Sequence, residues 1–412
     1  MPIPKPNKVE LLAPAGNFEK LEIAIHYGAD AIYLGGKDFS LRNFSGNFSL
    51  EEIKQAVTYA HDRAVKVYAA VNVYARNDQH QQIAAYLRKL GAISLDGVIV
   101  ADPGVFMTAR ELMPHIPLHL STQANSTNYK TVAFWERLGI QRINLARELT
   151  LAEIKAIAEK AQIEIEAFVH GAMCIAYSGR CLLSSFMANR HSNRGMCTHP
   201  CRWKYALVEE TRPGQYMPVA EDDRGTYIFN SKDLCMIEHI PAMIDAGVAA
   251  LKIEGRMKGI NYLASVLKVY REAIDWYSRD PAGYCVKPEW LIELSKINHR
   301  GYCTGFYFDD PRQIVPDYEF SKTMDTHLFI GKVLAAHDDG RTLMEVRNKC
   351  GTGDLVEILS PRQEIRKTCI GDMQDDDGNQ IQFARPGTCV YPDLGVKTKP
   401  NDLIRKLNQS HN

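Results

Sequence analysis

Gly97-Val-Ile-Val-Ala-Asp102 is a short, mostly β-branched run that ends in a polar side chain. Similar runs recur every few tens of residues through the first two thirds of the chain, separated by amphipathic stretches and small-residue breaks. Short apolar runs that alternate with helical patterns predict parallel strands joined by helices. Eight such runs are present, at residues 10–16, 31–35, 66–72, 97–102, 118–122, 142–146, 163–168 and 250–254.

The stretches between these runs carry helix start and stop signals. Ser49 with Glu52 and Thr150 with Glu153 have the spacing of capping boxes, which satisfy free backbone groups at a helix start. Glycines fall where the helices should end, at Gly28, Gly91, Gly139 and Gly247. Eight strand–helix units predict an α/β fold, a (β/α)8 TIM-type barrel whose active site lies at the carboxyl ends of the strands.

The chain divides into three predicted parts. Residues 1–279 form the barrel, with a cysteine-rich insertion at about 170–230 before the last strand. Residues 280–319 are rich in Pro, Gly and aromatic residues and do not fit the repeat, so we expect a linker or clamp. Residues 320–412 contain short alternating runs (329–334, 343–346, 355–359 and 381–383) separated by turns, which predicts a small antiparallel β-barrel domain.

The composition is that of an ordinary globular protein. Lys plus Arg and Asp plus Glu are equal at 49 each, so any nucleic-acid binding must come from a local basic patch. No stretch approaches the roughly 20 apolar residues of a membrane span, and the start lacks the apolar core of a signal peptide. We therefore expect a cytoplasmic protein with no membrane partner.

Four cysteines are clustered in the insertion: Cys174, Cys181, Cys197 and Cys201. Neighbouring thiolates repel one another unless a cation neutralises them, so this cluster in a cytoplasmic protein indicates a soft metal. The spacing alone allows either tetrahedral zinc or an iron–sulfur cluster, although the wide first pair is less typical of a zinc knuckle. Cys235 could replace one ligand, or it could be a buried thiol on a helix.

The same segment holds no Asp or Glu between Glu166 and Glu209. Its unopposed cations favour a polyanion such as RNA, and its aromatic residues could stack an unpaired base. Alternatively, the cations offset the negative charge of a thiolate-bound cluster. The candidate RNA-binding residues are Arg190, Arg194, Arg202, Trp203 and Lys204.

Polar residues at the ends of predicted strands should line the barrel mouth. The candidate substrate-binding residues are Gln123, Asn125, Arg147 and Arg256, and the candidate catalytic residues are Glu166, His170, Lys252 and Glu254. The cations could hold a small dicarboxylate, because guanidinium groups bind carboxylates through paired hydrogen bonds. Glu166 and His170 could act as acid–base groups or as partners of the metal ligands.

The cysteine segment resembles the signature of the collagenase-like peptidase U-32 family. The matching residues are Glu166-x-Phe168-x-x-Gly171-Ala-Met-Cys174-x₄-Gly179-x-Cys181-x-Leu183-Ser184 and Asn193-Arg-Gly-Met-Cys197-Thr-His-Pro-Cys201-Arg-Trp203. The resemblance extends to Leu11-Leu-Ala-Pro-Ala-Gly16, Asn230-Ser-Lys-Asp233, Lys252-Ile-Glu-Gly-Arg256 and His299-Arg-Gly-Tyr-Cys-Thr-Gly305.

This resemblance implies a chemistry other than the one in the family name. Relatives hydroxylate the wobble uridine of tRNA or a ribosomal RNA cytidine, or act in ubiquinone hydroxylation without dioxygen. The resemblance to the tRNA branch implies a [4Fe–4S] cluster on the four clustered cysteines, prephenate as a co-substrate, and formation of 5-hydroxyuridine. A partner protein of the same family is a further expectation.

Two other functions stay open at this point. The first is a collagenase-like peptidase, for which the sequence offers neither a His-Glu-x-x-His zinc helix nor a Gly-x-Ser-x-Gly elbow. Ser121 and Ser184 have no identifiable triad. The second is a non-catalytic subunit that binds RNA and whose cluster is structural.

Overall fold

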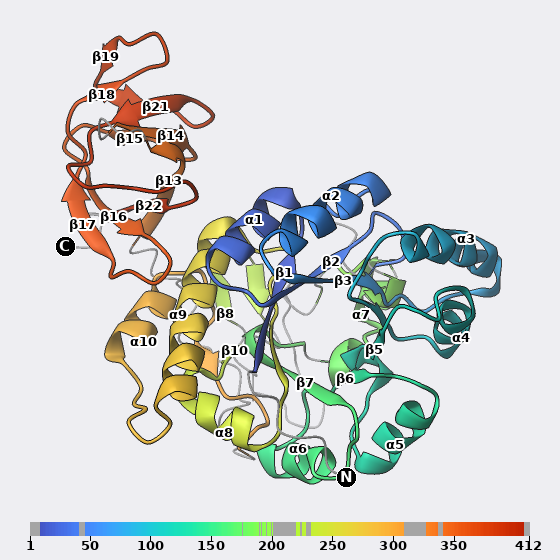
Figure 1. Ribbon diagram of the computed structural model, residues 1–412. Coiled ribbons are helices and arrows are strands. Elements are labelled where there is room, and N and C mark those ends of the chain that lie inside the picture. Colours follow the sequence, from blue (N-terminus) through green and yellow to red (C-terminus); the bar gives the residue numbers. More distant parts are fainter. Residues whose placement is uncertain are drawn as a thin grey trace, which may run out of the picture.

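A closed ring of parallel strands forms the larger part of the molecule (Figure 1). The computed structural model describes residues 9–40, 46–174, 176–188, 190, 192–194, 196–198, 200, 220–222, 225–227, 232–308, 327–336 and 341–407. The ring confirms the predicted barrel, since its last strand pairs with both its first and its seventh. Its strands are β1 (Glu10–Ala15), β2 (Ala31–Gly35), β3 (Lys66–Val71), β4 (Gly97–Val100), β5 (Leu118–Leu120), β6 (Arg142–Asn144), β7 (Glu164–Ala172) and β11 (Ala250–Ile253).

Helices surround the ring and begin and end at the predicted signals. Ser49 Oγ accepts a hydrogen bond from the amide of Glu52 at 3.2 Å, whose carboxylate accepts from the amide of Ser49 at 2.6 Å. Thr150 and Glu153 form the same reciprocal pair. The helices are α1 (Phe18–His26), α2 (Leu50–His61), α3 (His80–Gly91), α4 (Pro103–Leu112), α5 (Tyr129–Arg137), α6 (Leu151–Ala158), α8 (Ile240–Asp245) and α9 (Ile260–Arg279), with short 3-10 turns η1 (Asn77–Gln79), η2 (Thr122–Ala124) and η6 (Ile237–His239).

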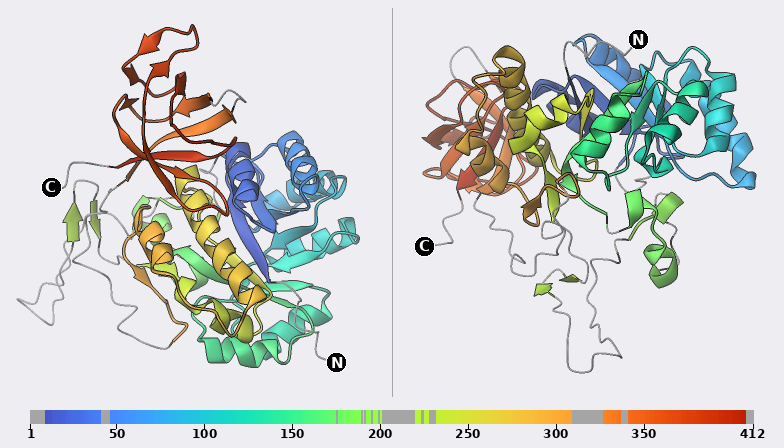
Figure 2. Two further views of the ribbon diagram at one scale, coloured as in Figure 1. Left: turned by 60° about the vertical axis from the view of Figure 1, so that its left-hand side comes forward. Right: turned by 90° about the horizontal axis from the view of Figure 1, so that it is seen from below.

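Strand β7 continues beyond the ring and anchors the cysteine-rich insertion. Its last residues pair antiparallel with β10 (Asp233–Cys235), which in turn pairs with β12 (Tyr302–Cys303). The insertion therefore leaves and rejoins the barrel at one point, and Figure 2 shows α7 outside the ring. Its described elements are η3 (Tyr177–Gly179), α7 (Leu183–Ala188), η4 (Ser192–Arg194), β8 (Ala220–Asp222) and β9 (Gly225–Tyr227).

The C-terminal domain is a curled antiparallel sheet with its own hydrophobic core, as expected for a small β-domain (Figure 1). The eight strands of the main sheet run in the order β17-β16-β22-β13-β14-β21-β18-β19. The predicted run at 381–383 is two short strands rather than one. The strands are β13 (His327–Ala336), β14 (Thr342–Val346), β15 (Cys350–Gly351), β16 (Leu355–Leu359), β17 (Arg366–Cys369), β18 (Met373–Gln374), β19 (Gln380–Ile381), β20 (Phe383–Ala384), β21 (Cys389–Pro392) and β22 (Leu403–Leu407).

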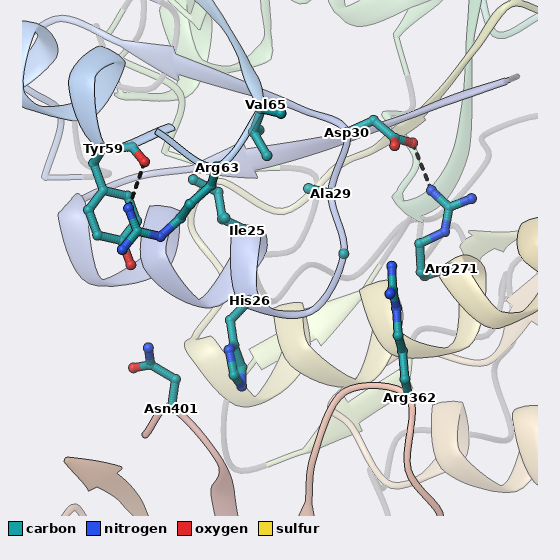
Figure 3. Close-up of a pocket in the computed structure, with 12 residues that line it drawn as sticks. Ile25, His26, Ala29, Asp30, Tyr59, Arg63, Val65, Arg271, Arg362 and Asn401 are labelled. Atoms are coloured by element: carbon teal, nitrogen blue, oxygen red, sulfur yellow. Dashed lines mark hydrogen bonds and ion pairs between the residues drawn. The ribbon is translucent and has the colours of Figure 1, made fainter. Parts of the chain in front are cut away.

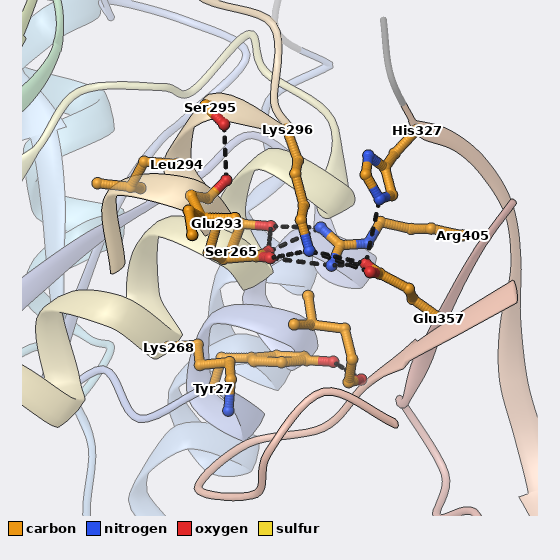
Figure 4. Close-up of polar contacts among 12 residues, drawn as sticks. Tyr27, Ser265, Lys268, Glu293, Leu294, Ser295, Lys296, His327, Glu357 and Arg405 are labelled. Atoms are coloured by element: carbon orange, nitrogen blue, oxygen red, sulfur yellow. Dashed lines mark hydrogen bonds and ion pairs between the residues drawn. The ribbon is translucent and has the colours of Figure 1, made fainter. Parts of the chain in front are cut away.

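The two domains meet at a buried cluster of charges (Figure 4). Arg405 of β22 makes two hydrogen bonds to Glu293 of α10 (Pro288–Ser295), at 2.7 and 3.0 Å, and one to Glu357 of β16 at 3.1 Å. Lys296 lies 2.9 Å from Glu357. Since α10 also buries Trp290 in the barrel core, this helix of the predicted linker segment packs against the barrel. Within the described residues, no helix is long and apolar enough to cross a membrane.

Candidate active site at the barrel mouth

A cavity of about 250 Å³ opens at the carboxyl ends of the barrel strands. Its walls come from residues that end or follow β3, β5, β6, β7 and β11, the position at which barrel enzymes place their active sites. Of the residues predicted for the mouth, five line this cavity together with the thiols discussed below: Gln123, Arg147, Lys252, Glu254 and Arg256. Asn125 is not among the lining residues.

Three cations face this cavity and are held in place by aromatic and polar groups. The guanidinium of Arg147 lies 3.9 Å from the centre of the Phe168 ring and donates to the carbonyl of Ala172 at 2.9 Å. Lys252 Nζ lies 2.7 Å from Glu166 Oε1 and 4.4 Å from the centre of the Tyr33 ring. These contacts hold both cations at the cavity wall, where Glu166 partly compensates the charge of Lys252.

The third cation, Arg256, is tightly enclosed. Its Nη2 donates to Ser40 Oγ at 2.8 Å and to Asn47 Oδ1 at 2.7 Å. Gly35 at the end of β2 permits this position, because a Cβ there would lie 2.6 Å from Arg256 Nη1. A side chain larger than hydrogen at residue 35 would therefore displace the guanidinium.

Two amide side chains in the cavity have acceptors without a hydrogen-bond partner. The Oδ1 of Asn144 and the Oε1 of Gln123 are buried and accept no hydrogen bond from any described residue. An unpaired buried acceptor costs about 1–3 kcal/mol, so these two oxygens in the cavity wall are candidate acceptors for a bound ligand. The sequence analysis missed Asn144, although it ends β6 in the same way that the chosen residues end other strands.

Three of the four clustered thiols, Cys174, Cys181 and Cys197, line the same cavity. Burial raises the pKa of Cys181, and the other two thiols raise it further. Ser184 Oγ lies 3.7 Å from Cys197 Sγ. The three thiols are therefore near enough for the charge of Cys174 and Cys197 to act on Cys181.

The loop that carries these thiols is fixed to the barrel by side chains. Glu148, which follows β6, accepts hydrogen bonds from the amide and the hydroxyl of Ser178, both at 2.5 Å. Ser178 has left-handed backbone angles (φ 43°), so this anchor holds a conformation that a non-glycine residue rarely adopts. Arg180 Nε donates to the carbonyl of Gln123 at 3.0 Å. Sequence reasoning gave Glu148 and Ser178 no such role.

The donor set suits a thiolate-bound metal, although no described group of three His, Cys, Asp or Glu side chains has the geometry of a metal site. Cys201, the fourth predicted ligand, lies outside the described residues. Thiolates that share one cavity favour soft metals, and three sulfurs at the mouth leave the reacting space beside them.

The predicted catalytic residues separate into two groups. Lys252 and Glu254 line the cavity, and Glu166 contacts Lys252 from within the barrel. His170 instead faces the rings of Tyr262, Tyr270 and Tyr302, outside the cavity lining. Burial lowers the pKa of His170 to about 3, so this imidazole stays neutral near pH 7 and packs as a core residue.

Cys235 does not line the cavity that holds the three clustered thiols. It is buried on β10, where its sulfur lies 3.9 Å from Tyr270 Oη, and burial raises its pKa to about 11. The expectation of a helical position was wrong, because residues 233–235 extend the edge of β7. Within the described structure, Cys235 is a core thiol.

Of the predicted RNA-binding residues, only Arg190 has a described side chain, and it is exposed. The side chain of Arg194 and all of Arg202, Trp203 and Lys204 lie outside the described residues. Tyr177, Leu182 and Met187 of the cysteine-rich insertion are exposed, as is Met257, which lines the cavity. For a serine peptidase, the described residues hold no histidine hydrogen-bonded to Ser121 or Ser184.

The chain is a TIM-barrel protein with a C-terminal β-domain. Thiols line the candidate active site at the barrel mouth. A model of peptidase family U32 matches residues 16–316, and a model of the family's C-terminal domain matches residues 325–405. The chain belongs to peptidase family U32.

Similar curated proteins carry differing names. The tRNA hydroxylation protein P1 of Bacillus subtilis is 43% identical over 97% of this chain and 95% of its own length. An uncharacterised protease of Methanocaldococcus jannaschii is also 43% identical, over 98% and 99%. A 23S rRNA 5-hydroxycytidine synthase of Escherichia coli is 35% identical over 84% of this chain and 54% of its own length.

Proposed function

We propose that this protein hydroxylates C5 of the wobble uridine in tRNA, without dioxygen, and uses a [4Fe–4S] cluster. One observation carries the proposal: thiols, cations and unpartnered amide oxygens line a single cavity at the barrel mouth. The names of two relatives, one for tRNA hydroxylation and one for an rRNA hydroxycytidine, support RNA as the substrate.

The side-chain amides of Asn144 and Gln123 can recognise a base through hydrogen bonds. A uracil ring turned out of an unpaired loop presents its N3–H donor between two carbonyl acceptors, and amide side chains pair with such an edge. Asn144 and Gln123 offer the acceptor for N3–H at the wall of the cavity. The anticodon loop is single-stranded, so its bases can reach a pocket of this depth.

The cations supply a carboxylate site for prephenate as the co-substrate. Arg147 and Lys252 line the same cavity and both lie close to the Phe168 ring, at 3.9 and 5.5 Å from its centre. Two cations beside one ring suit a dicarboxylate, because each cation can contact one carboxylate. Glu166 positions Lys252 by an ion pair from below.

The cluster would be held by Cys174, Cys181 and Cys197 together with Cys201. Replacing C5–H by C5–OH needs an oxygen donor and removes two electrons from the base, and a bound iron–sulfur cluster would supply one-electron redox chemistry beside the cavity. The residues of the chain bind and orient the base, hold the co-substrate carboxylates and exclude water. Glu254 lies in the same wall, within reach of a proton released at C5.

The experiment is complementation of a deletion strain followed by mass spectrometry of tRNA nucleosides. We expect the parent gene to restore 5-hydroxyuridine and Cys181→Ser to fail, while Cys285→Ser, an exposed cysteine elsewhere, restores it fully. Protein purified without oxygen should contain iron and sulfide, and Cys181→Ser should lose both. Near-stoichiometric zinc without sulfide would reject the cluster, and gelatin cleavage by metal-free protein would favour the peptidase.

A further inference from the structure

A second cavity, of about 410 Å³, lies at the opposite end of the barrel (Figure 3). Its barrel wall comes from the segments that lead into β2 and β3, at residues 28–30 and 63–65. Its other wall is the β-domain, which contributes Arg362 from the loop between β16 and β17 and Asn401 from the loop before β22. This basal cavity therefore spans the junction of the two domains and is separate from the mouth.

The lining of the basal cavity carries more cations than carboxylates. Arg63, Arg271 and Arg362 line it together with His26, whereas Asp30 is the one carboxylate among its described lining residues. That carboxylate is already engaged, since Arg271 Nη1 lies 2.7 Å from Asp30 Oδ2. The Nη2 of Arg271 is neutralised by Asp275 at 2.6 Å. Arg271 is only 4% exposed and forms the floor of the basal cavity.

Two of the arginines retain their charge. The guanidinium of Arg63 lies 3.6 Å from the centre of the Tyr59 ring and donates through Nη1 to a carbonyl at 3.0 Å, a geometry that holds it flat without neutralising it. Arg362 makes no side-chain hydrogen bond or ion pair with any described residue, and Figure 3 shows it rising from its loop into the cavity. His26 lies 3.9 Å from Asp402, so its pairing is loose.

The geometry points to a binding site for a small phosphate-bearing ligand at this junction. Planar guanidinium groups match the oxygens of phosphate, and two uncompensated ones facing a cavity attract a dianion. A volume of about 410 Å³ is that of a site for a small molecule rather than for a polymer. Inorganic phosphate, pyrophosphate and a nucleoside monophosphate share this chemistry.

Such a ligand would join the barrel to the β-domain. It would contact Arg63 on one side and Arg362 on the other, and any ligand that binds only the folded protein raises its stability by mass action. Binding should therefore raise the melting temperature and weaken as salt is added.

The test is calorimetric titration of the full-length protein with phosphate, pyrophosphate and AMP in turn, together with the melting temperature. We expect saturable binding of at least one probe, and a loss of about tenfold or more in Arg63→Ala and in Arg362→Ala. Arg385→Ala, an exposed arginine of the same domain outside the cavity, should bind as the parent does. Unfolding curves of each variant should match the parent in the absence of ligand, because Arg63 and Arg362 are exposed.

Two results would overturn the inference. One is no saturable binding of any probe up to about 10 mM, the weak limit for a specific site. The other is binding that is equal in the parent and both cavity variants. If only an RNA oligonucleotide binds in an Arg362-dependent manner, the small-ligand assignment is also wrong.

Discussion

The domain junction and the barrel mouth both bury charged and polar groups, but they satisfy them differently. At the junction Arg405, Glu293 and Glu357 each have an opposite charge within 3.1 Å. At the mouth Asn144 and Gln123 bury amide oxygens that no described residue pairs. The first pattern holds two domains together, and the second leaves hydrogen bonds for a ligand to complete.

This difference separates buried polar groups that stabilise the fold from buried polar groups that bind a ligand. A buried ion pair stabilises a fold only weakly overall, but removing one partner leaves a costly unpaired charge. An unpaired acceptor costs stability in the free protein and is retained where binding needs it. Changes at the junction should therefore lower stability, whereas changes to the mouth amides should lower function.

Arg405→Met should have the largest effect. It removes the cation that lies between Glu293 and Glu357, which keep Lys296 and, for Glu357, the more distant His327 and Lys367, so we expect the free energy of unfolding to fall by about 3 kcal/mol. Urea denaturation measures this. The exposed Arg385→Met should change it by less than about 0.5 kcal/mol. If Arg405→Met and Arg385→Met lower the free energy of unfolding by an equally small amount, the charge cluster at the junction is not what stabilises the fold.

Asn144→Ala should lower activity and leave stability nearly unchanged, in contrast to Arg405→Met. We expect tRNA hydroxylation to fall about 10- to 100-fold, because a lost hydrogen bond to a buried base edge costs about 1.4–2.8 kcal/mol. The free energy of unfolding should stay within about 1 kcal/mol of the parent, since the oxygen has no partner in the protein. Normal modification together with a large loss of stability would show that Asn144 is structural.

As the pH falls, protonation of barrel histidines should lower the free energy of unfolding before protonation of Glu357 at the domain junction does. Burial lowers the pKa of His170 to about 3 and that of His119 well below its usual value, so the unfolded chain binds protons below about pH 6.5 that the folded protein does not. The free energy of unfolding should fall by about 1.4 kcal/mol per pH unit for each histidine. Hydrogen bonds and cations hold the pKa of Glu357 at about 2 despite its burial, so its contribution is lost only below about pH 4.5.

This order can be tested with two variants. Between pH 7 and about pH 5 the slope should be shallower in His170→Asn than in the parent. Glu357→Gln should leave that slope unchanged and flatten the profile only in stronger acid. A slope that is unchanged in His170→Asn would contradict the assignment.

Ser178→Ala should have the smallest effect. It removes one of the two hydrogen bonds to Glu148, which contributes about 1 kcal/mol to holding the thiol loop. We expect a modest drop in the iron bound after anaerobic purification, with no change in the unfolding transition of the barrel. The exposed Ser295→Ala, remote from the loop, is the matched control.

The barrel could be predicted from sequence because strand period, capping boxes and helix-ending glycines act locally. Every expected strand of the ring is present, and β-domain strands near 329, 343 and 355 fall where alternation placed them. The extension of β7 by β10 and β12 could not be predicted, because it joins residues more than sixty positions apart. Long-range pairing leaves little local signal in two- and three-residue strands.

The site was predicted in part for the same reason. Residues that end strands converge in any barrel of this type, so Lys252, Arg147 and Gln123 were found from position alone. His170 was misjudged as a mouth residue because the direction of a side chain at the end of a long strand depends on the β10 pairing. Glu148 could not be assigned a role, since its partner Ser178 lies thirty residues away in an irregular loop.

The pairing of Ala172 with Asp233 places the two ends of the cysteine-rich segment next to each other. A tight turn grafted between them would complete an antiparallel hairpin and leave the ring uninterrupted. The thiol-bearing segment can thus be exchanged as a single module, while the barrel strands beneath it keep their sequence.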